Sequence, residues 1–185
     1  AGLSVTTGTI NTLIGGLAGD ALTTGNSNVA VGYNTLSGDT KGDRSTAIGM
    51  QALALQNFTT NTDAYNTAVG YNAGYSVTTG VQNTIMGGLS GDSITTGSNN
   101  TALGYATLSE NTTASNNTAV GFKALIVNTT GANNVAVGAD SLDSNTTGDN
   151  NVAVGMDALQ ANTSGLTNTA VGQAALSANT TGNVN

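Results

Sequence analysis

The sequence predicts an all-β fold, a parallel β-solenoid of about ten 17-residue coils. The first observation is a glycine that recurs every 17 residues, with one interval of 21, at Gly15, Gly32, Gly49, Gly70, Gly87, Gly104, Gly121, Gly138, Gly155 and Gly172. The second is the phrase Asn/Ser-x-Ala-Val-Gly, or a close variant, which each of these glycines closes. A fixed period of this length indicates one small unit stacked on copies of itself. A unit this short has no room for two packed helices, so we expect each unit to form one β coil.

Each unit is numbered here from the first residue of its phrase, so that the recurring glycine is position 5. Positions 1 to 5, as in Asn134–Gly138, are β-branched and closed by glycine, which predicts a strand followed by a tight turn. Positions 12 to 15, as in Asn128–Gly131, predict a second short strand. The expected coil is therefore strand, turn, strand, turn. The near-continuous Asn at position 1 predicts a ladder of side-chain amides, each bonded to the next.

Apolar residues at positions 4 and 9 predict the core. The expected core residues are Val31, Val120, Val137, Val154 and Val171 at position 4, and Leu36, Leu125, Leu142, Leu159 and Leu176 at position 9. Three units have glycine at position 9 and an apolar residue at position 12: Gly19 with Leu22, Gly74 with Val77, and Gly91 with Ile94. This exchange conserves volume, so positions 9 and 12 should share one close-packed core.

The expected domain organisation is a partial coil at residues 1–10 and a continuous solenoid at 11–185, together one domain. The long interval places four extra residues within 54–65, where we expect a surface insertion. Residues 1–8 realign with 73–80 at an offset of 72, which indicates growth by duplication of blocks of coils. Neither end contains a polar capping segment, so we expect a longer fibre or ends covered by a partner.

The composition excludes several function classes. The chain has no His and no Cys, the residues that most often act as general bases, nucleophiles and transition-metal ligands. No unit departs from the consensus to build a pocket, so we expect no enzyme, no catalytic residue and no cofactor. Three Lys and Arg against ten Asp and Glu argue against a nucleic-acid partner. No apolar run approaches the roughly 18 residues of a membrane span.

Two phrases of the repeat resemble known families. Asn-Val-Ala-Val-Gly at 28–32, 134–138 and 151–155 resembles the Ser-Val-Ala-Ile-Gly phrase of trimeric autotransporter adhesin heads. The fuller unit, Asn117–Leu125 followed by Asn128–Gly131, resembles repeats of bacteriophage tail-fibre and related virion proteins, which often precede an endosialidase-type chaperone. These resemblances imply a parallel β-roll or β-helix, commonly with three chains side by side, that works in host attachment.

We therefore expect a rigid spacer in a phage tail fibre or a similar virion appendage. The alternatives are a bacterial surface adhesin head, a self-assembling extracellular filament, and an ice-binding or calcium-binding solenoid. The expected location is a virion appendage, the cell surface or the extracellular space. The expected partners are further copies of the chain, as a homotrimer or an end-to-end polymer, and a host receptor or glycan.

Three consecutive apolar residues, as in Val135-Ala136-Val137, predict a strand that is buried on both faces. One face would fill the coil, and the other could contact a neighbouring chain. The alternative is that position 2, which is mostly Thr, only faces solvent.

Four sets of residues are candidates for binding. Position 6 carries Tyr33, Tyr71, Tyr105 and Phe122, a strip that could stack on sugar rings or, alternatively, ring on ring or against another chain. Asp20 and Asp92 follow glycine-rich segments similar to calcium-binding nonapeptides, with a capped turn as the alternative. Asp140 and Asp157 in successive coils could hold a cation, unless Lys123 pairs with Asp140. Paired Thr residues at positions 13 and 14 predict flat Thr ladders, the basis of the ice-binding alternative.

Overall fold

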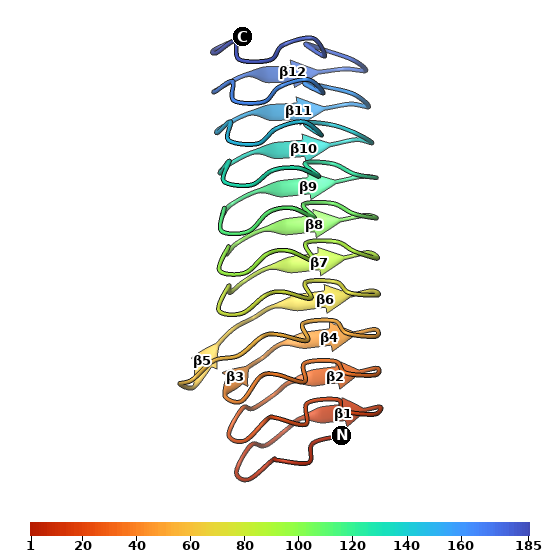
Figure 1. Ribbon diagram of the computed structural model, residues 1–185, viewed down its shortest axis with the longest axis vertical. Coiled ribbons are helices and arrows are strands. Elements are labelled where there is room, and N and C mark those ends of the chain that lie inside the picture. The colour runs from red at the N-terminus through yellow and green to blue at the C-terminus, as the bar shows by residue number, and fades with distance from the viewer.

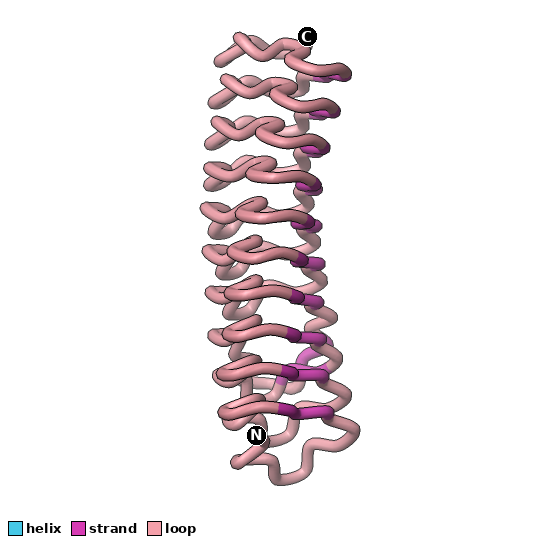
Figure 2. The backbone as a smooth tube through the Cα atoms, turned by 90° about the vertical axis from the view of Figure 1, so that its right-hand side faces the viewer, coloured by secondary structure: helices cyan, strands magenta, loops and turns pink.

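The computed structural model describes residues 1–185 and forms a parallel β-solenoid of about nine turns, with no helix. Figure 1 shows the coils stacked into a rod with one strand of the main sheet in each coil, and Figure 2 shows the same stack from the side. The ten strands of the main sheet are β1 (Thr12–Ile14), β2 (Val29–Val31), β4 (Thr46–Ile48), β6 (Thr67–Val69), β7 (Thr84–Met86), β8 (Thr101–Leu103), β9 (Thr118–Val120), β10 (Val135–Val137), β11 (Val152–Val154) and β12 (Thr169–Val171). A second sheet pairs β3 (Gly42–Asp43) with β5 (Thr62–Asp63).

The strands of the main sheet pair in parallel and in the register of the repeat. Val135 of β10 lies between Thr118 of β9 and Val152 of β11, so identical positions of successive coils meet. The same register holds for all neighbouring strands from β1 to β12. The predicted fold class, an all-β parallel solenoid, is therefore confirmed.

The second strand predicted in each coil is wrong for the regular coils. Asn128–Gly131 contains no strand, and the backbone bends there. The N–H groups of Thr129, Thr130 and Gly131 all donate to the carbonyl of Thr146, at 3.0, 3.1 and 3.4 Å. Three successive N–H groups can converge on one oxygen only if the chain curls, because successive N–H groups of an extended strand point to opposite sides.

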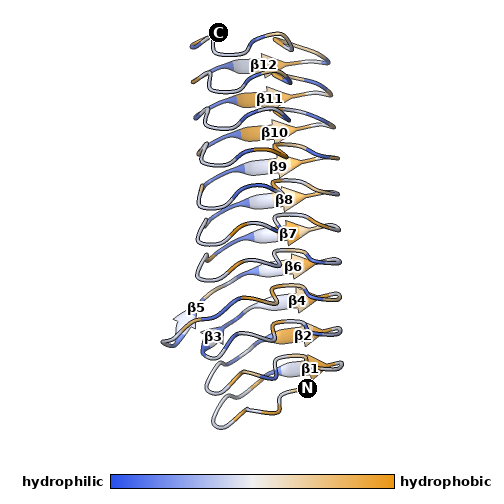
Figure 3. Cartoon of the chain, viewed as in Figure 1, coloured by the Kyte–Doolittle hydropathy of each residue, from blue (hydrophilic) through white to orange (hydrophobic).

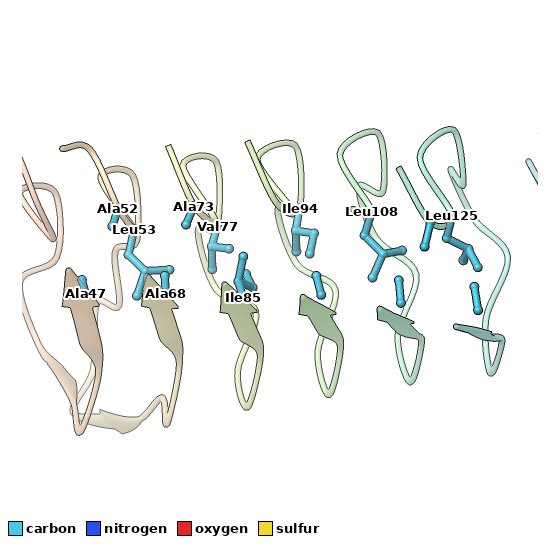
Figure 4. Close-up of a cluster of buried hydrophobic side chains, with 14 of the residues drawn as sticks. Ala47, Ala52, Leu53, Ala68, Ala73, Val77, Ile85, Ile94, Leu108 and Leu125 are labelled. Atoms are coloured by element: carbon cyan, nitrogen blue, oxygen red, sulfur yellow. The ribbon is translucent and has the colours of Figure 1, made fainter. Parts of the chain in front are cut away.

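The core lies between the strand and the turn opposite it. Figure 4 shows Ala47 and Ala68 on their strands, with Leu53, Leu108 and Leu125 extending from the opposite side of the coil. The leucines predicted at position 9 are buried at Leu36, Leu125, Leu142 and Leu159, whereas Leu176 in the last coil is 39% exposed.

The prediction that position 4 belongs to the core is wrong. Position 3, which is Ala in most coils, is the buried residue of each strand, and position 4 points outward. Val31, Val120, Val137 and Val154 are only half-buried, and Val171 is 70% exposed. The reason is strand alternation: when position 3 faces inward, positions 2 and 4 must both face outward.

The exchange between positions 9 and 12 is confirmed. Ile94 is fully buried, and a Cβ added at Gly91 would lie 2.8 Å from the Ile94 Cδ1 atom. Position 9 has a left-handed backbone in both kinds of coil, with φ of 53° at Gly91 and 50° at Leu142. Glycine adopts this conformation readily, whereas leucine adopts it at a cost of about 1–2 kcal/mol. Burial of the Leu142 side chain offsets that cost, since it contributes about 1.5–3 kcal/mol.

The predicted amide ladder at position 1 is confirmed in part: the Nδ2 of Asn151 donates to Asn134 Oδ1 at 3.2 Å, but most bonds of the ladder join a side-chain amide to backbone. The Oδ1 atom of Asn134 accepts the backbone N–H of Asn151 at 2.9 Å, and its Nδ2 donates to the carbonyl of Gly148 at 2.8 Å. A second ladder, which was not predicted, runs along position 12. There the Nδ2 of Asn145 donates to Asn128 Oδ1 at 2.8 Å and to the Gly148 carbonyl at 3.0 Å.

The long interval of the repeat forms an irregular coil between Asp39 and Asn66. Asn57 lies 17 residues beyond Thr40, its hydrogen-bond partner in the coil before. Thr62, however, pairs with Gly42 at a separation of 20. The extra residues therefore bulge out between the two contacts, within the range 54–65 in which the insertion was expected.

Candidate functional site: the outer face of the sheet

One regular surface of the rod is the outward side of the main sheet. We call it the outer sheet face and define it as positions 2, 4 and 6 of the ten coils, from Thr12, Ile14 and Gly16 to Thr169, Val171 and Gln173. Position 2 is Thr or Val throughout, and position 4 is aliphatic or Met. Figure 3 shows β2, β10 and β11 as the most hydrophobic strands of this surface.

No charged residue lies within positions 1 to 6 of any coil, although the Lys123 ammonium of position 7 reaches over the Phe122 ring at the edge of the face. Its apolar side chains are not covered by the chain itself: Ile14 is 58% exposed and Met86 is 44% exposed. Parallel sheets are normally covered on both faces. This sheet is covered by its own chain on the inner face only.

The predicted aromatic strip lies along one edge of the outer sheet face. Tyr33, Tyr71, Tyr105 and Phe122 are all about half exposed. Only two of the rings stack on each other: those of Tyr105 and Phe122 are 5.9 Å apart at an interplanar angle of 12°. The ring of Tyr33 covers Gly16 of the coil before it, where an added Cβ would lie 3.3 Å from the ring. The column is therefore one stacked pair plus separate rings, rather than a continuous strip.

No three of the four candidate cation ligands come together. Asp20, Asp92, Asp140 and Asp157 are half-buried in separate coils, and no group of three or more acidic side chains forms a metal cluster. Burial, reinforced by the negative charge of Glu110, raises the pKa of Asp92. One Asp92 carboxylate oxygen, Oδ1, is buried without a hydrogen-bond partner.

The alternative pairing of Lys123 with Asp140 is wrong. The Lys123 ammonium lies 5.1 Å from the centre of the Phe122 ring, a cation–π arrangement. The ion pair of the structure is instead Arg44 with Asp63, at the edge of the insertion. The Arg44 guanidinium also lies 5.7 Å from the centre of the Tyr65 ring. This cluster was not predicted, although the charged residues beside the long interval were a signal for it.

The two Thr columns differ in their hydrogen bonding. At position 13 the hydroxyl of Thr129 donates to the carbonyl of Thr146 at 3.0 Å, and Thr146 donates likewise to Thr163. These hydroxyls tie one coil to the next. At position 14 the side chains of Thr130 and Thr147 are exposed. Of the two predicted ladders, the one at position 14 therefore faces solvent more fully.

Comparisons with known proteins assign no family to this chain. No family model matches it, and no curated protein and no solved structure matches it either. The structure contains no helix of the length and apolarity needed to cross a membrane. Its surface contains no pocket.

Proposed function

We propose that this chain is a rigid spacer segment of an elongated fibre, in a phage tail fibre or a similar virion appendage that serves host attachment. The observation that supports this role most directly is the identity of the contacts between successive coils: strand register, leucine column and amide ladder repeat from coil to coil. In such a stack each coil depends only on its neighbours, so length is set by the number of coils.

The sequence supports the same role through its block repeat. Residues 1–8 and 73–80 are related by an offset of 72, which is four coils of 17 residues plus the insertion of four. Adding a block of four regular coils lengthens the rod by about 19 Å, since parallel strands are about 4.8 Å apart. The proposal includes lateral association of copies, as in the three-chain fibres whose repeats this sequence resembles.

A duplication of four regular coils tests the spacer role. A second copy of residues 100–167, which are four units of 17, inserted after Thr167 keeps every position in register. The variant should retain its β-type circular dichroism, and small-angle scattering should show a rod longer by about 19 Å.

The matched control inserts residues 101–167, one residue fewer. A slip of one residue turns inward side chains outward, so this variant should misfold. Equal tolerance of the two insertions, or a register-keeping insertion that leaves the length unchanged, contradicts the proposal.

Labelling tests the location. Gold-labelled antibodies against the chain should mark fibres on virus particles from its source. Labelling confined to a bacterial surface favours the adhesin-head alternative, and labelling of free filaments favours the filament alternative.

A further inference from the structure

The outer sheet face has the composition of a protein–protein contact. The cores of such contacts are depleted of charged residues and enriched in aromatic residues and Met. This face has no charged residue, presents Met50, Met86 and Met156, and has the stacked Tyr105–Phe122 pair at its edge. Position 7 just beyond it is polar or charged in six of the ten coils, as at Lys123 and Asp140, so a polar rim borders part of the face.

The size of the face matches a stable interface. Ten strands about 4.8 Å apart, each presenting five residues of about 3.3 Å, cover roughly 800 Å². A standard protein–protein interface buries about 800 Å² on each partner. The face is therefore large enough to hold one partner along the length of the rod.

The charge of the chain favours a second copy of itself as that partner. With a net charge of −7, two copies repel wherever their acidic residues approach. The outer sheet face has no charged residue at positions 1 to 6 of any coil, so two copies can meet on it without bringing acidic residues of these positions together. Two parallel copies also share the same spacing between coils, so their side-chain rows match along the whole sheet, which a partner without this repeat cannot do.

We propose that this chain binds a second copy of itself side by side through the outer sheet face, with the two rod axes parallel. This inference rests on the proposed fibre function and adds the surface that joins the copies. It assigns the outward-facing Val and Ile residues of position 4 to the contact between chains, and the Ala of position 3 to the core of each chain.

Charge placed on the face should separate the copies. The double variant Val120→Lys with Val137→Lys puts two ammonium groups on neighbouring strands β9 and β10. The matched control, Thr130→Lys with Thr147→Lys, adds the same charge to the same two coils at exposed positions away from the face. Sedimentation velocity should show wild type and control with a mass of more than one 18.1 kDa chain. The face variant should sediment as a single chain, with the dissociation constant raised at least about 100-fold.

A cross-linking experiment gives an answer even if the charged variant misfolds. The chain has no cysteine, so a single introduced thiol is unique. Thr118→Cys lies on the outer sheet face and should form covalent dimers with a short bis-maleimide. Thr147→Cys lies off the face and should not.

Several outcomes overturn the inference. One is a wild type that stays a single chain up to about 1 mM, which corresponds to a binding free energy weaker than about −4 kcal/mol. Others are equal effects of the face and control variants, and equal cross-linking at both cysteines. If a single-chain wild type binds glycans and the face variant does not, the face serves a carbohydrate instead. A single-chain wild type whose length still grows on coil duplication would refute this interface and leave the spacer function standing.

Discussion

The regular coils of residues 100–168 and the irregular coil of residues 39–66 hold the start of their strands in different ways. In the regular coils, Asn134 bonds to Asn151 and Gly148, and the same contacts recur in each coil. In the irregular coil, position 1 is Ser45, whose side chain is too short for the ladder. Gln56 bridges the gap: its Nε2 donates to Ser45 Oγ at 3.0 Å, and its Oε1 accepts from Asn66 at 2.8 Å.

In the ladder, the hydrogen bonds of one Asn are satisfied by the same residue type in the next coil. Where the ladder is interrupted, the polar groups need a specific set of side chains as partners. Gln56 also donates to the buried carboxylate of Asp39 at 2.7 Å, and Asp39 accepts the backbone N–H groups of Gly42 and Phe58. Each polar atom of Gln56 and Asp39 bonds to a different group, so no other side chain of the cluster can replace a partner that is lost. The same substitution should therefore lower the free energy of unfolding by a similar amount in each regular coil. In the irregular coil the loss should depend on which residue is replaced.

The largest effect is expected where the backbones of two regular coils meet. A Cβ added at Gly138 would lie 2.5 Å from the carbonyl oxygen of Gly155, which is backbone and cannot move aside. Gly138→Ala should therefore prevent folding or cost more than about 4 kcal/mol. Gly172→Ala is the control, because its φ of +122° is similarly strained but no atom lies within 4 Å. Urea unfolding of the two variants measures the difference, and equal losses would show that strain alone matters.

Removal of one rung of the amide ladder should have the next largest effect. Asn134→Ala leaves the buried N–H of Asn151 without its acceptor, at about 1–3 kcal/mol. It also removes one of the two side-chain donors of the Gly148 carbonyl, which keeps its bond from Asn145, at about 1 kcal/mol more. Ser45→Ala removes one acceptor from Gln56, which keeps its bond to Asp39, so it should cost only about 1 kcal/mol. Equal losses in the free energy of unfolding would contradict the stronger dependence of the regular coils on their position 1 side chain.

Truncation of the leucine column should cost about 2–5 kcal/mol, by lost transfer energy and by the cavity left behind. Leu142→Ala tests a regular coil, where Leu125 and Leu159 occupy the same position on either side. Leu53→Ala should cost more, because the next coil has Gly74 there, and a Cβ at Gly74 would lie 3.1 Å from Leu53 Cδ2. Thr147→Ala, at an exposed position, should change stability by less than about 0.5 kcal/mol. Thermal unfolding of the three variants checks this order, and a smaller loss for Leu53→Ala would contradict it.

The smallest effect is the pH dependence of the irregular coil. Burial raises the pKa of Asp39 above its ordinary value of 3.8, although hydrogen bonds from Gln56 and from backbone N–H groups oppose the shift. The folded chain then holds a proton that the unfolded chain has lost, so this contribution to stability falls as pH rises from 3.8 to the raised pKa.

The Asn side chain of Asp39→Asn cannot titrate. The melting temperature of this variant should therefore rise relative to that of the wild type as the pH increases from 3 to 8. Asp157→Asn, in a regular coil, serves as the control for loss of a negative charge. A stability difference between wild type and Asp39→Asn that does not change with pH would contradict the assignment.

Several features of the fold were predictable because they recur in the sequence. The period of the glycines determined the solenoid, the leucines at position 9 determined one side of the core, and the Asn at position 1 determined a ladder. The exchange between positions 9 and 12 was predictable because a close-packed interior conserves volume. The coil with Leu142 at position 9 has Asn145 at position 12, whereas the coil with Gly91 has Ile94 there. The outer sheet face was predicted only in part, since the strand was expected to be apolar on both faces but position 4 was placed in the core.

The sequence by itself determined the coil, its length and the residues that must lie in equivalent places. Only the tertiary structure decided which side of the strand faces inward, because Val-Ala-Val is apolar at all three positions and hydrophobicity cannot separate its two faces. The answer follows from space: the interior of so narrow a coil holds Leu142 opposite a methyl group such as that of Ala136, and valine at position 3 would add volume there. The second Asn ladder was likewise decided by stacking, which places Asn128 and Asn145 within hydrogen-bond distance.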